Sequence, residues 1–172
     1  MQRTYMTKLR IVVTALGALV LQVAVAGPQA THEFTIPASD FNRGNVRVSL
    51  VGQQYAAVRA CIWHGGELPN AAEYDITFPA AGSYTLLGLY TANDSRPVDI
   101  FLDGVKVHTG FSGTTGSWDT LTATWEEQCT FQVAEGKHIL RLQRDQCMPH
   151  ICALRFRGSV PFPEGWCPDR GD

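Results

Sequence analysis

The sequence lacks the short motifs that mark the best-known classes of hydrolase, metalloprotease and phosphate-binding enzyme. It contains no G-x-S-x-G, no H-E-x-x-H, no S-x-x-K and no glycine-rich phosphate loop. Its carboxylates are scattered along the chain. A glycosidase needs two of them ~5–9 Å apart across the bond that it cleaves, and spacing along a chain does not reveal such a pair. We therefore expect no catalytic function, with a small lyase or hydrolase as the weaker alternative.

A strong charge of either sign is also missing. The chain has 14 Lys and Arg residues against 16 Asp and Glu residues, which gives a net charge of −2. Proteins that bind nucleic acids or anionic membranes concentrate positive charge on one surface. The composition therefore offers no electrostatic case for either of these partners.

Helical periodicity is absent from the chain beyond its first 26 residues. Short β-rich runs separated by Gly, Pro, Asn and Asp predominate instead. Val98, Ile100 and Leu102 alternate with Asp99, so one face of that strand is apolar and the other polar, as in antiparallel sheets. The pattern predicts an all-β protein, an antiparallel β-sandwich of the jelly-roll kind. The expected strands are His32–Ile36, Val46–Val51, Ala56–Trp63, Ala72–Phe78, Ser83–Thr91, Val98–Leu102, Val105–Thr109, Cys129–Val133, Lys137–Gln143 and Ile151–Arg157.

Two turns connect predicted strands closely. Asp103-Gly104 separates two alternating runs, and a two-residue Asp-Gly loop favours a type I′ hairpin because both residues take positive φ. A second hairpin is expected through Ala134, Glu135 and Gly136.

The N-terminal 26 residues have the pattern of a secretory signal peptide. The first ten residues contain three basic residues, Arg3, Lys8 and Arg10, and no acidic one. An apolar run extends over Ile11–Leu21, and small residues stand at Ala24 and Ala26. An uncleaved membrane anchor is the alternative, but a spanning helix needs about 20 apolar residues and this run is shorter. We expect cleavage after Ala26, a secreted or periplasmic protein, and no membrane partner once the signal peptide is removed.

Cleavage leaves 146 of the 172 residues, enough for one domain. We place the β-sandwich at residues 27–159. Residues 160–172 are rich in Pro and Gly and are expected to form an irregular C-terminal tail.

All five cysteines lie in the exported part of the chain, where disulfides are permitted. Five is an odd number, so at most two bridges form. The hairpin expected after Val133 would bring Cys129 and Cys147 to the same end of the sandwich, and this pair is the first disulfide that we predict. No pair has the spacing typical of zinc ligands; the nearest is Cys147-x₄-Cys152 around His150, and no metal site is expected.

Five segments, in the same order along the chain, resemble family 6 and family 35 carbohydrate-binding modules. They include the turn Pro79-Ala-Ala-Gly-Ser-Tyr84, the loop Gly116-Ser-Trp118 and the strand start Glu135-Gly-Lys-His138. The resemblance extends from about Ala72 to Phe156. It implies a galactose-binding-like sandwich that holds a polysaccharide or oligosaccharide in loops at one end. The segments are Ala72–Leu87, Arg96–Gly104, Thr115–Asp119, Glu135–Leu142 and Pro149–Phe156.

The resemblance also implies two site residues. Trp118 matches the aromatic that stacks on a sugar ring, and an indole suits the apolar C–H face of a sugar. His150 matches the polar residue of the last loop, where asparagine is usual, and its ring donates and accepts hydrogen bonds. Family 6 modules carry acidic residues near the N-terminus, some of them calcium ligands. Here those positions hold residues 37–39, Pro-Ala-Ser, followed by Asp40, so no cofactor is expected and calcium is doubtful.

Three further residues are candidates for ligand contact. Arg43 and Asn45 belong to a polar loop, where Arg43 suits an acidic sugar. Trp63 stands beside His64 and two glycines and would form a second wall of the site. Each candidate has a structural alternative. Trp118 would cap the end of the sandwich, His150 would bond a loop carbonyl, and Arg43 would bond nearby backbone.

The sequence thus predicts a secreted, non-catalytic carbohydrate-binding module. The alternative is a structural or protein-interaction sandwich that has lost sugar binding, because fold alone does not determine function. The two hypotheses differ in whether Trp118 is exposed beside polar groups or packed beneath the loops.

Overall fold

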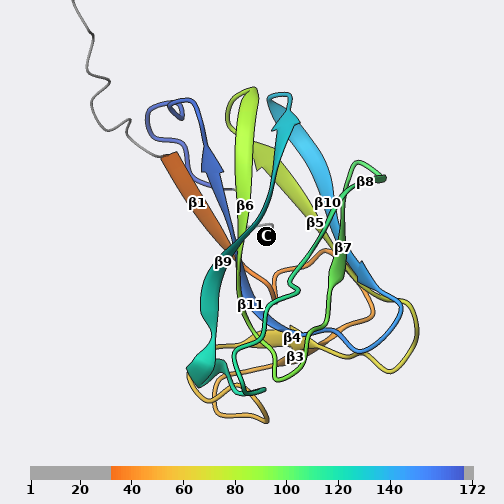
Figure 1. Ribbon diagram of the computed structural model, residues 1–172. Helices are drawn as coiled ribbons and strands as arrows, with labels where there is room; N and C mark the ends of the chain where they lie inside the picture. The colour runs from red at the N-terminus through yellow and green to blue at the C-terminus, as the bar shows by residue number, and fades with distance from the viewer. Residues whose placement is uncertain (1–31, 169–172) are drawn as a thin grey trace, which may run out of the picture.

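The computed structural model describes residues 32–168 and contains eleven strands and one short 3₁₀ helix within them (Figure 1). The expected signal peptide, residues 1–26, lies outside the described residues. No helix in the described part is long and apolar enough to cross a membrane. The elements are β1 (His32–Pro37), β2 (Arg43–Gly44), β3 (Arg47–Ser49), β4 (Cys61–Trp63), β5 (Asn70–Phe78), β6 (Gly82–Thr91), β7 (Val98–Leu102), β8 (Val105–Gly110), η1 (Thr120–Thr122), β9 (Thr124–Val133), β10 (Gly136–Arg144) and β11 (His150–Gly158).

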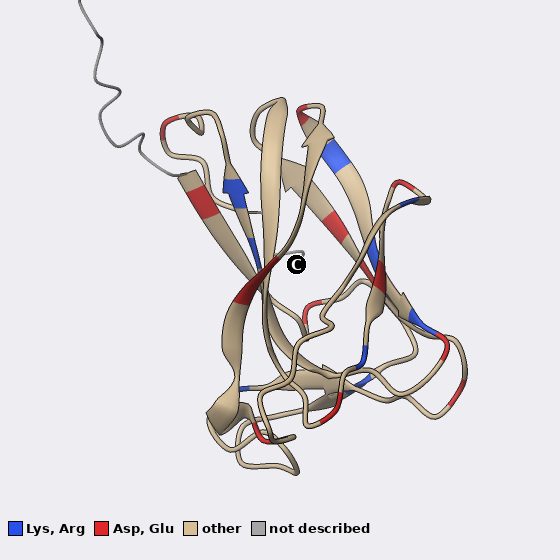
Figure 2. Cartoon of the chain, viewed as in Figure 1, with Lys and Arg blue, Asp and Glu red and all other residues tan. Residues whose placement is uncertain are grey.

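The strands form two antiparallel sheets that face each other, which confirms the predicted sandwich. The first sheet, sheet A, has the order β3-β4-β11-β6-β9, and β1 also pairs with β11. The second, sheet B, has the order β2-β5-β10-β7-β8. Both β1 and β4 pair with β11: β1 along Ala153–Gly158, and β4 at Ile151. Acidic and basic residues are interspersed over both sheets instead of gathering by sign (Figure 2).

Alternation along the strands decides which side chains fill the core. Val98 and Ile100 are fully buried, while Asp99 between them faces outward and pairs with Lys106. Leu154 and Phe156 on β11 are also fully buried, as the alternating pattern predicts. Burying each large apolar side chain contributes about 1.5–3 kcal/mol.

The Asp103-Gly104 hairpin is also confirmed. The two residues have φ values of 50° and 80°, as a type I′ turn requires, and they join β7 directly to β8. The Asp103 carboxylate accepts hydrogen bonds from the Ile139 amide at 2.9 Å and from His138 Nδ1 at 2.6 Å. The turn is therefore held against β10 as well as by its own backbone preference.

Two local predictions are wrong. The strand expected over Ala56–Trp63 begins only at Cys61, because residues 50–60 form a loop that covers the outer face of β4. The turn through Glu135 is not a hairpin. It carries the chain from β9 in sheet A to β10 in sheet B, and each strand pairs with other neighbours.

This crossover also removes the basis for the expected Cys129–Cys147 bridge. Cys129 lies midway along β9, opposite Leu86 on β6. Cys147 lies in the loop that follows β10, where its carbonyl accepts a hydrogen bond from Arg144 Nε at 2.9 Å. One residue thus lies within sheet A and the other in a loop at the end of a strand of sheet B, and all five cysteines are unbonded in the structure.

The end of the sandwich opposite β3 and β4 is covered by the start of the C-terminal tail. Residues 160–168 contain no helix or strand, but two of their aromatic rings pack inward. The Trp166 and Phe34 ring centroids are 5.2 Å apart, and Phe162 stacks on Tyr84 at 6.2 Å. The tail therefore adds apolar cover to the first and sixth strands.

Candidate functional site

Five connections converge at the end of the sandwich near β3 and β4, which we call the loop end (Figure 1). They are residues 50–60, 64–69, 92–97, 111–123 and 145–149. The connections at the opposite end are shorter turns and the tail. Because loops carry most binding residues while the strands hold them in place, the loop end is the first place to look for a site.

His150, the first residue of β11, stands at the centre of an aromatic cluster at this end. Its ring centroid lies 4.6 Å from that of Tyr55, 5.2 Å from that of Trp118 and 6.2 Å from that of Trp63. Tyr55 also meets Trp63 edge to face at 5.7 Å. We call these four residues the aromatic cluster. Three of them, Trp63, Trp118 and His150, are sequence-predicted site residues that the fold brings together.

Backbone hydrogen bonds fix the loops that carry the cluster. Tyr55 has a φ of 67°, and its carbonyl accepts a bond from the Thr120 amide at 2.9 Å. Asp119 caps the short 3₁₀ helix η1, because its carboxylate accepts a bond from the Leu121 amide at 2.8 Å. The first bond joins loop 50–60 to the loop that contains Trp118, and the second fixes the Trp118 loop internally.

Burial favours the neutral form of His150. The ring is almost fully enclosed, and this desolvation lowers its pKa; the nearby Arg96 charge lowers it further. Nδ1 lies 2.6 Å from the Trp118 carbonyl oxygen, and because a carbonyl oxygen can only accept, Nδ1 carries a proton and donates it there. The structural alternative for His150, a bond to a loop carbonyl, is therefore present in the structure.

Arg96 covers one face of Trp118. The guanidinium carbon lies 3.8 Å from the indole centroid, a close cation–π contact. Arg96 also donates from Nη1 to the Met148 carbonyl at 3.1 Å and from Nε to Asp94 at 3.2 Å. Trp118 itself is partly buried and packs against the core. The indole thus caps the sandwich end and supports Arg96, which occupies the face where a sugar ring would stack.

A pocket of about 530 Å³ lies beside Arg96. Asp94 has its side chain 62% exposed, and Leu68 is 59% exposed. Arg144 is held across the pocket by the carbonyls of Pro97 at 2.7 Å and Cys147 at 2.9 Å. The lining residues are His64, Gly66, Leu68, Asp94, Arg96, Arg144, Gln146 and Cys147.

These groups suit a polyhydroxylated ligand. The carboxylate of Asp94 accepts hydrogen bonds, the two guanidinium groups donate them, and the imidazole and amide groups do both. Charged donors and acceptors form the stronger hydrogen bonds to hydroxyls. The pocket therefore combines both kinds of partner with one exposed apolar side chain, Leu68.

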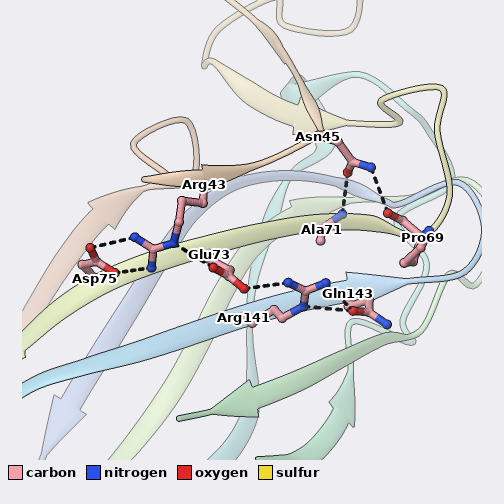
Figure 3. A network of polar contacts seen from close by, with 8 residues as sticks. All are labelled: Arg43, Asn45, Pro69, Ala71, Glu73, Asp75, Arg141 and Gln143. Carbon is pink, nitrogen blue, oxygen red and sulfur yellow. Dashed lines mark hydrogen bonds and ion pairs between the residues drawn. The ribbon is translucent and has the colours of Figure 1, made fainter. Parts of the chain in front are cut away.

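The other two sequence-predicted residues lie elsewhere and are already occupied. Arg43 bonds Glu73 at 2.9 Å and both oxygens of Asp75, on the outer face of sheet B (Figure 3). Glu73 continues this network to Arg141 at 2.6 Å. The side chain of Asn45 bonds the backbone of Ala71 at 2.8 Å and Pro69 at 3.0 Å, so it positions the start of β5.

A larger hollow of about 930 Å³ is lined by residues of β1 and β5 and by three aromatic residues, of which only Phe41 is partly exposed. Two of its aromatic residues, Phe34 and Tyr74, are buried in the core. The Tyr74 hydroxyl donates to the Ala38 carbonyl at 2.8 Å. The loop end therefore remains the better candidate for ligand binding.

The residues at the family's calcium position do not fit that ion. Pro37 has no side-chain oxygen, the carbonyl of Ala38 is occupied by Tyr74, and the Ser39 hydroxyl bonds Asp40 at 3.1 Å. Among residues 32–168 there is no group of three or more His, Cys, Asp or Glu side chains able to hold a metal.

Sequence reasoning missed four residues of the site. Asp94, Arg96, Arg144 and Tyr55 were not among the candidate binding residues. A signal was available for Asp94 and Arg96, which flank a turn between two strong strand patterns. Nothing local marks Tyr55 or Arg144, which reach the site only through the packing of distant loops.

Comparison with known proteins supports the fold. No protein-family model matches the chain, and no curated protein shows significant sequence similarity to it. Among solved structures, a family 35 carbohydrate-binding module from Clostridium thermocellum is similar with a TM-score of 0.60 and 21% identity, over 73% of this chain and 97% of that one. The C-terminal family 6 module of a marine laminarinase from Zobellia galactanivorans has a TM-score of 0.60 and 18% identity, over 73% and 98%.

A third similar structure contains a ligand. It is a family 35 module solved in complex with a disaccharide that contains glucuronic acid, with a TM-score of 0.55 and 17% identity, over 73% of this chain and 94% of that one. Identities this low establish the fold alone. The chain has the fold of family 35 and family 6 carbohydrate-binding modules.

Proposed function

We propose that this chain is a secreted, non-catalytic module that binds a glycan in the polar pocket at the loop end. The observation that carries the proposal is the pocket beside Arg96, which gathers hydrogen-bonding side chains, Asp94 and Gln146 among them exposed, from three loops and the end of β10. Trp118 acts mainly by holding Arg96 in place through the contact at 3.8 Å. His150 packs against Trp118, and Trp63 in turn packs against His150.

The chemistry of the pocket matches that of a sugar. Of two neighbouring hydroxyls on a sugar ring, one can donate a hydrogen bond to a carboxylate while the other accepts one from a guanidinium group. Asp94 and Arg96 together therefore suit such a pair of hydroxyls. Leu68, 59% exposed, offers an apolar contact for the C–H face of the ring. Such shallow sites give modest dissociation constants, on the order of micromolar to millimolar.

The similar structures and the N-terminal segment point the same way. The solved structures that share this fold are described as carbohydrate-binding modules, one of them in complex with an acidic disaccharide. The basic and apolar pattern of the first 26 residues is that of a signal peptide, which fits export to where polysaccharides occur.

The test is a glycan array with the purified domain, followed by titration calorimetry on the glycans that bind. Asp94→Asn removes one charged acceptor with little change in shape, and we expect about tenfold weaker binding. Trp118→Ala frees Arg96 and is expected to weaken binding by at least as much.

Two matched variants serve as controls. Asp99→Asn removes a carboxylate from the outer face of sheet B, and Arg43→Ala removes a guanidinium from the same face. Both should leave glycan affinity unchanged. Equal loss in Asp94→Asn and Asp99→Asn would mean that binding depends on overall charge and would overturn the assignment of the pocket.

The competing function is a structural or protein-interaction sandwich. One observation favours it: Arg96 covers the Trp118 face that would otherwise accept a sugar ring. A folded domain that binds no glycan on the array would establish this alternative over the glycan site.

A further inference from the structure

Two cysteines face each other across the strand pair that supports the aromatic cluster. Strand β4 pairs with β11 in antiparallel register, with Ile62 opposite Ile151. One step further along each strand, this register would bring Cys61 beside Cys152, at a point where β11 bulges between Ile151 and Ala153. One step in the other direction it places Trp63 opposite His150, and those two rings do meet, at 6.2 Å. The ring contact supports the register on the side of His150, and on the other side both cysteines belong to one small buried cluster.

Both thiols also point to the same side. Ile62 and Ile151 belong to the main core, whereas Cys61 and Cys152 lie together in a second, smaller cluster on the outer face of sheet A. This cluster also contains Ala56 from loop 50–60. Cys61 is fully buried and Cys152 is 5% exposed.

The backbone spacing suits a disulfide. Directly opposed residues in an antiparallel pair have Cα atoms ~4.5 or ~5.5 Å apart, depending on the kind of pair. Disulfides span Cα separations of about 4.4–6.8 Å, which includes both values. The two strands thus lie at about the separation that a disulfide spans, and joining the sulfur atoms requires rotation of both side chains and adjustment of the bulged backbone at Cys152.

We propose that Cys61 and Cys152 form a disulfide in the exported protein, which ties β4 to β11 behind the glycan site. This inference rests on the export that the proposed function includes. The oxidant is a protein or small-molecule disulfide. The thiolate of one cysteine attacks it and releases one donor thiol, and the second cysteine then displaces the other. The pair loses two electrons and two protons, and the donor is reduced to two thiols.

Burial determines when the bridge forms. Desolvation raises the pKa of the Cys61 thiol to about 11 and that of Cys152 to about 12. Thiols with such pKa values provide few thiolates at neutral pH, so exchange in the closed fold is slow. Oxidation therefore takes place during folding, before loop 50–60 covers the pair.

The bridge would matter most for strand β4. This strand has only three residues and a single registered pair with β11. Strand β4 contains Trp63 and follows the loop that contains Tyr55. A bond between β4 and β11 would therefore fix the position of two of the four residues of the aromatic cluster. The bond closes a loop of 91 residues, which restricts the unfolded chain strongly.

The direct test is disulfide mapping of the full chain isolated from an oxidising compartment. The protein is unfolded with an alkylating agent but no reductant, digested, and analysed by mass spectrometry. We expect a linked pair of peptides that contain Cys61 and Cys152, lighter than the reduced pair by the mass of two hydrogen atoms. Cys129, Cys147 and Cys167 should be alkylated.

A second experiment tests whether the disulfide forms in protein that has not been exported. Protein made under reducing conditions is unfolded and refolded in a mixture of oxidised and reduced glutathione, and should give the same linked peptides. Its melting temperature should fall by about 10 °C on reduction. The variant with Cys61→Ala and Cys152→Ala should show no such shift, whereas Cys129→Ala with Cys147→Ala should retain it.

The inference would be overturned if Cys61 and Cys152 were both alkylated when protein that had folded under oxidising conditions is unfolded in the alkylating agent. A bridge from either residue to another cysteine would overturn it as well. Neither result bears on glycan binding, which the array measures separately. A linked pair in protein that binds no glycan would support the bridge and refute the proposed function.

Discussion

His150 lies among three aromatic rings and donates its Nδ1 proton to the Trp118 carbonyl oxygen at 2.6 Å. Burial favours the neutral form at this position, because a charged imidazole would lose its hydration, and the Trp118 carbonyl and the Asp119 carboxylate offset that cost only in part. Arg96, the nearest cation, disfavours the charged form further. A single buried histidine thus connects the stability of the loop end to pH.

We expect the free energy of unfolding to fall as the pH drops below about 6.5, the usual pKa of histidine. The folded-state pKa of His150 is depressed by burial. The unfolded chain therefore binds a proton that the folded chain does not, and the slope for one proton cannot exceed about 1.4 kcal/mol per pH unit. Carboxylates with lowered pKa, such as Asp99, contribute only at lower pH.

Chemical unfolding from pH 7.5 down to pH 5 would measure the effect. His150→Asn keeps a donor for the Trp118 carbonyl but does not titrate, and its stability should be flat over this range. A wild-type protein with equally flat stability would contradict the assignment of a neutral, buried His150.

At the scale of elements, β6 runs through the middle of sheet A and pairs with β9 and β11 along its length. Its centre contains Gly88, and the ring of Phe111 packs directly over that glycine. Phe111 has a φ of 57°, is fully buried, and donates its amide to Gln128. The strand thus provides the space through which the Trp118 loop enters the fold.

Gly88→Ala is expected to destabilise the domain by about 2 kcal/mol. The new methyl group would overlap the Phe111 ring, which is enclosed and has no free direction in which to move. Gly82→Ala in the same strand is the control, because the added carbon would make ordinary contacts of 3.4 Å with Ser159 and Val160. Thermal unfolding of both variants is the measurement, and equal melting temperatures would refute the packing argument.

At the scale of the whole molecule, the two ends of the sandwich have different roles. The loop end carries the polar pocket and the aromatic cluster, while the opposite end has tight turns and is covered by Phe162 and Trp166. The sheets between them hold both ends. Stability and binding should therefore respond separately to changes at opposite ends.

Truncation after Ser159 tests this separation. Removing Phe162 and Trp166 exposes Phe34 and Tyr84, and we expect a loss of roughly 2 kcal/mol or more, since each lost ring removes buried apolar area. Glycan affinity at a temperature where the truncated domain stays folded should equal that of the full chain. Affinity that falls with the tail would mean that the two ends are coupled.

Local patterns determined most of the fold. Side chains alternate between the two faces of a strand because of backbone geometry alone. The apolar positions in the sequence therefore predicted which face of each strand is buried, as at Val98, Ile100, Leu154 and Phe156. The Asp103-Gly104 turn was equally predictable, because positive φ is a property of those two residues.

Only the tertiary structure decided which strands pair and which loop residues meet. The turn at Glu135 is the same in sequence whether it forms a hairpin or crosses between sheets, and the sheet partners of β9 and β10 decide between the two. Arg43 and Arg96 are both arginines in polar loops, yet one binds Glu73 and Asp75 while the other lies over Trp118 beside a pocket. Contacts between residues far apart in the chain depend on the packing of the whole sandwich, and no local preference encodes them.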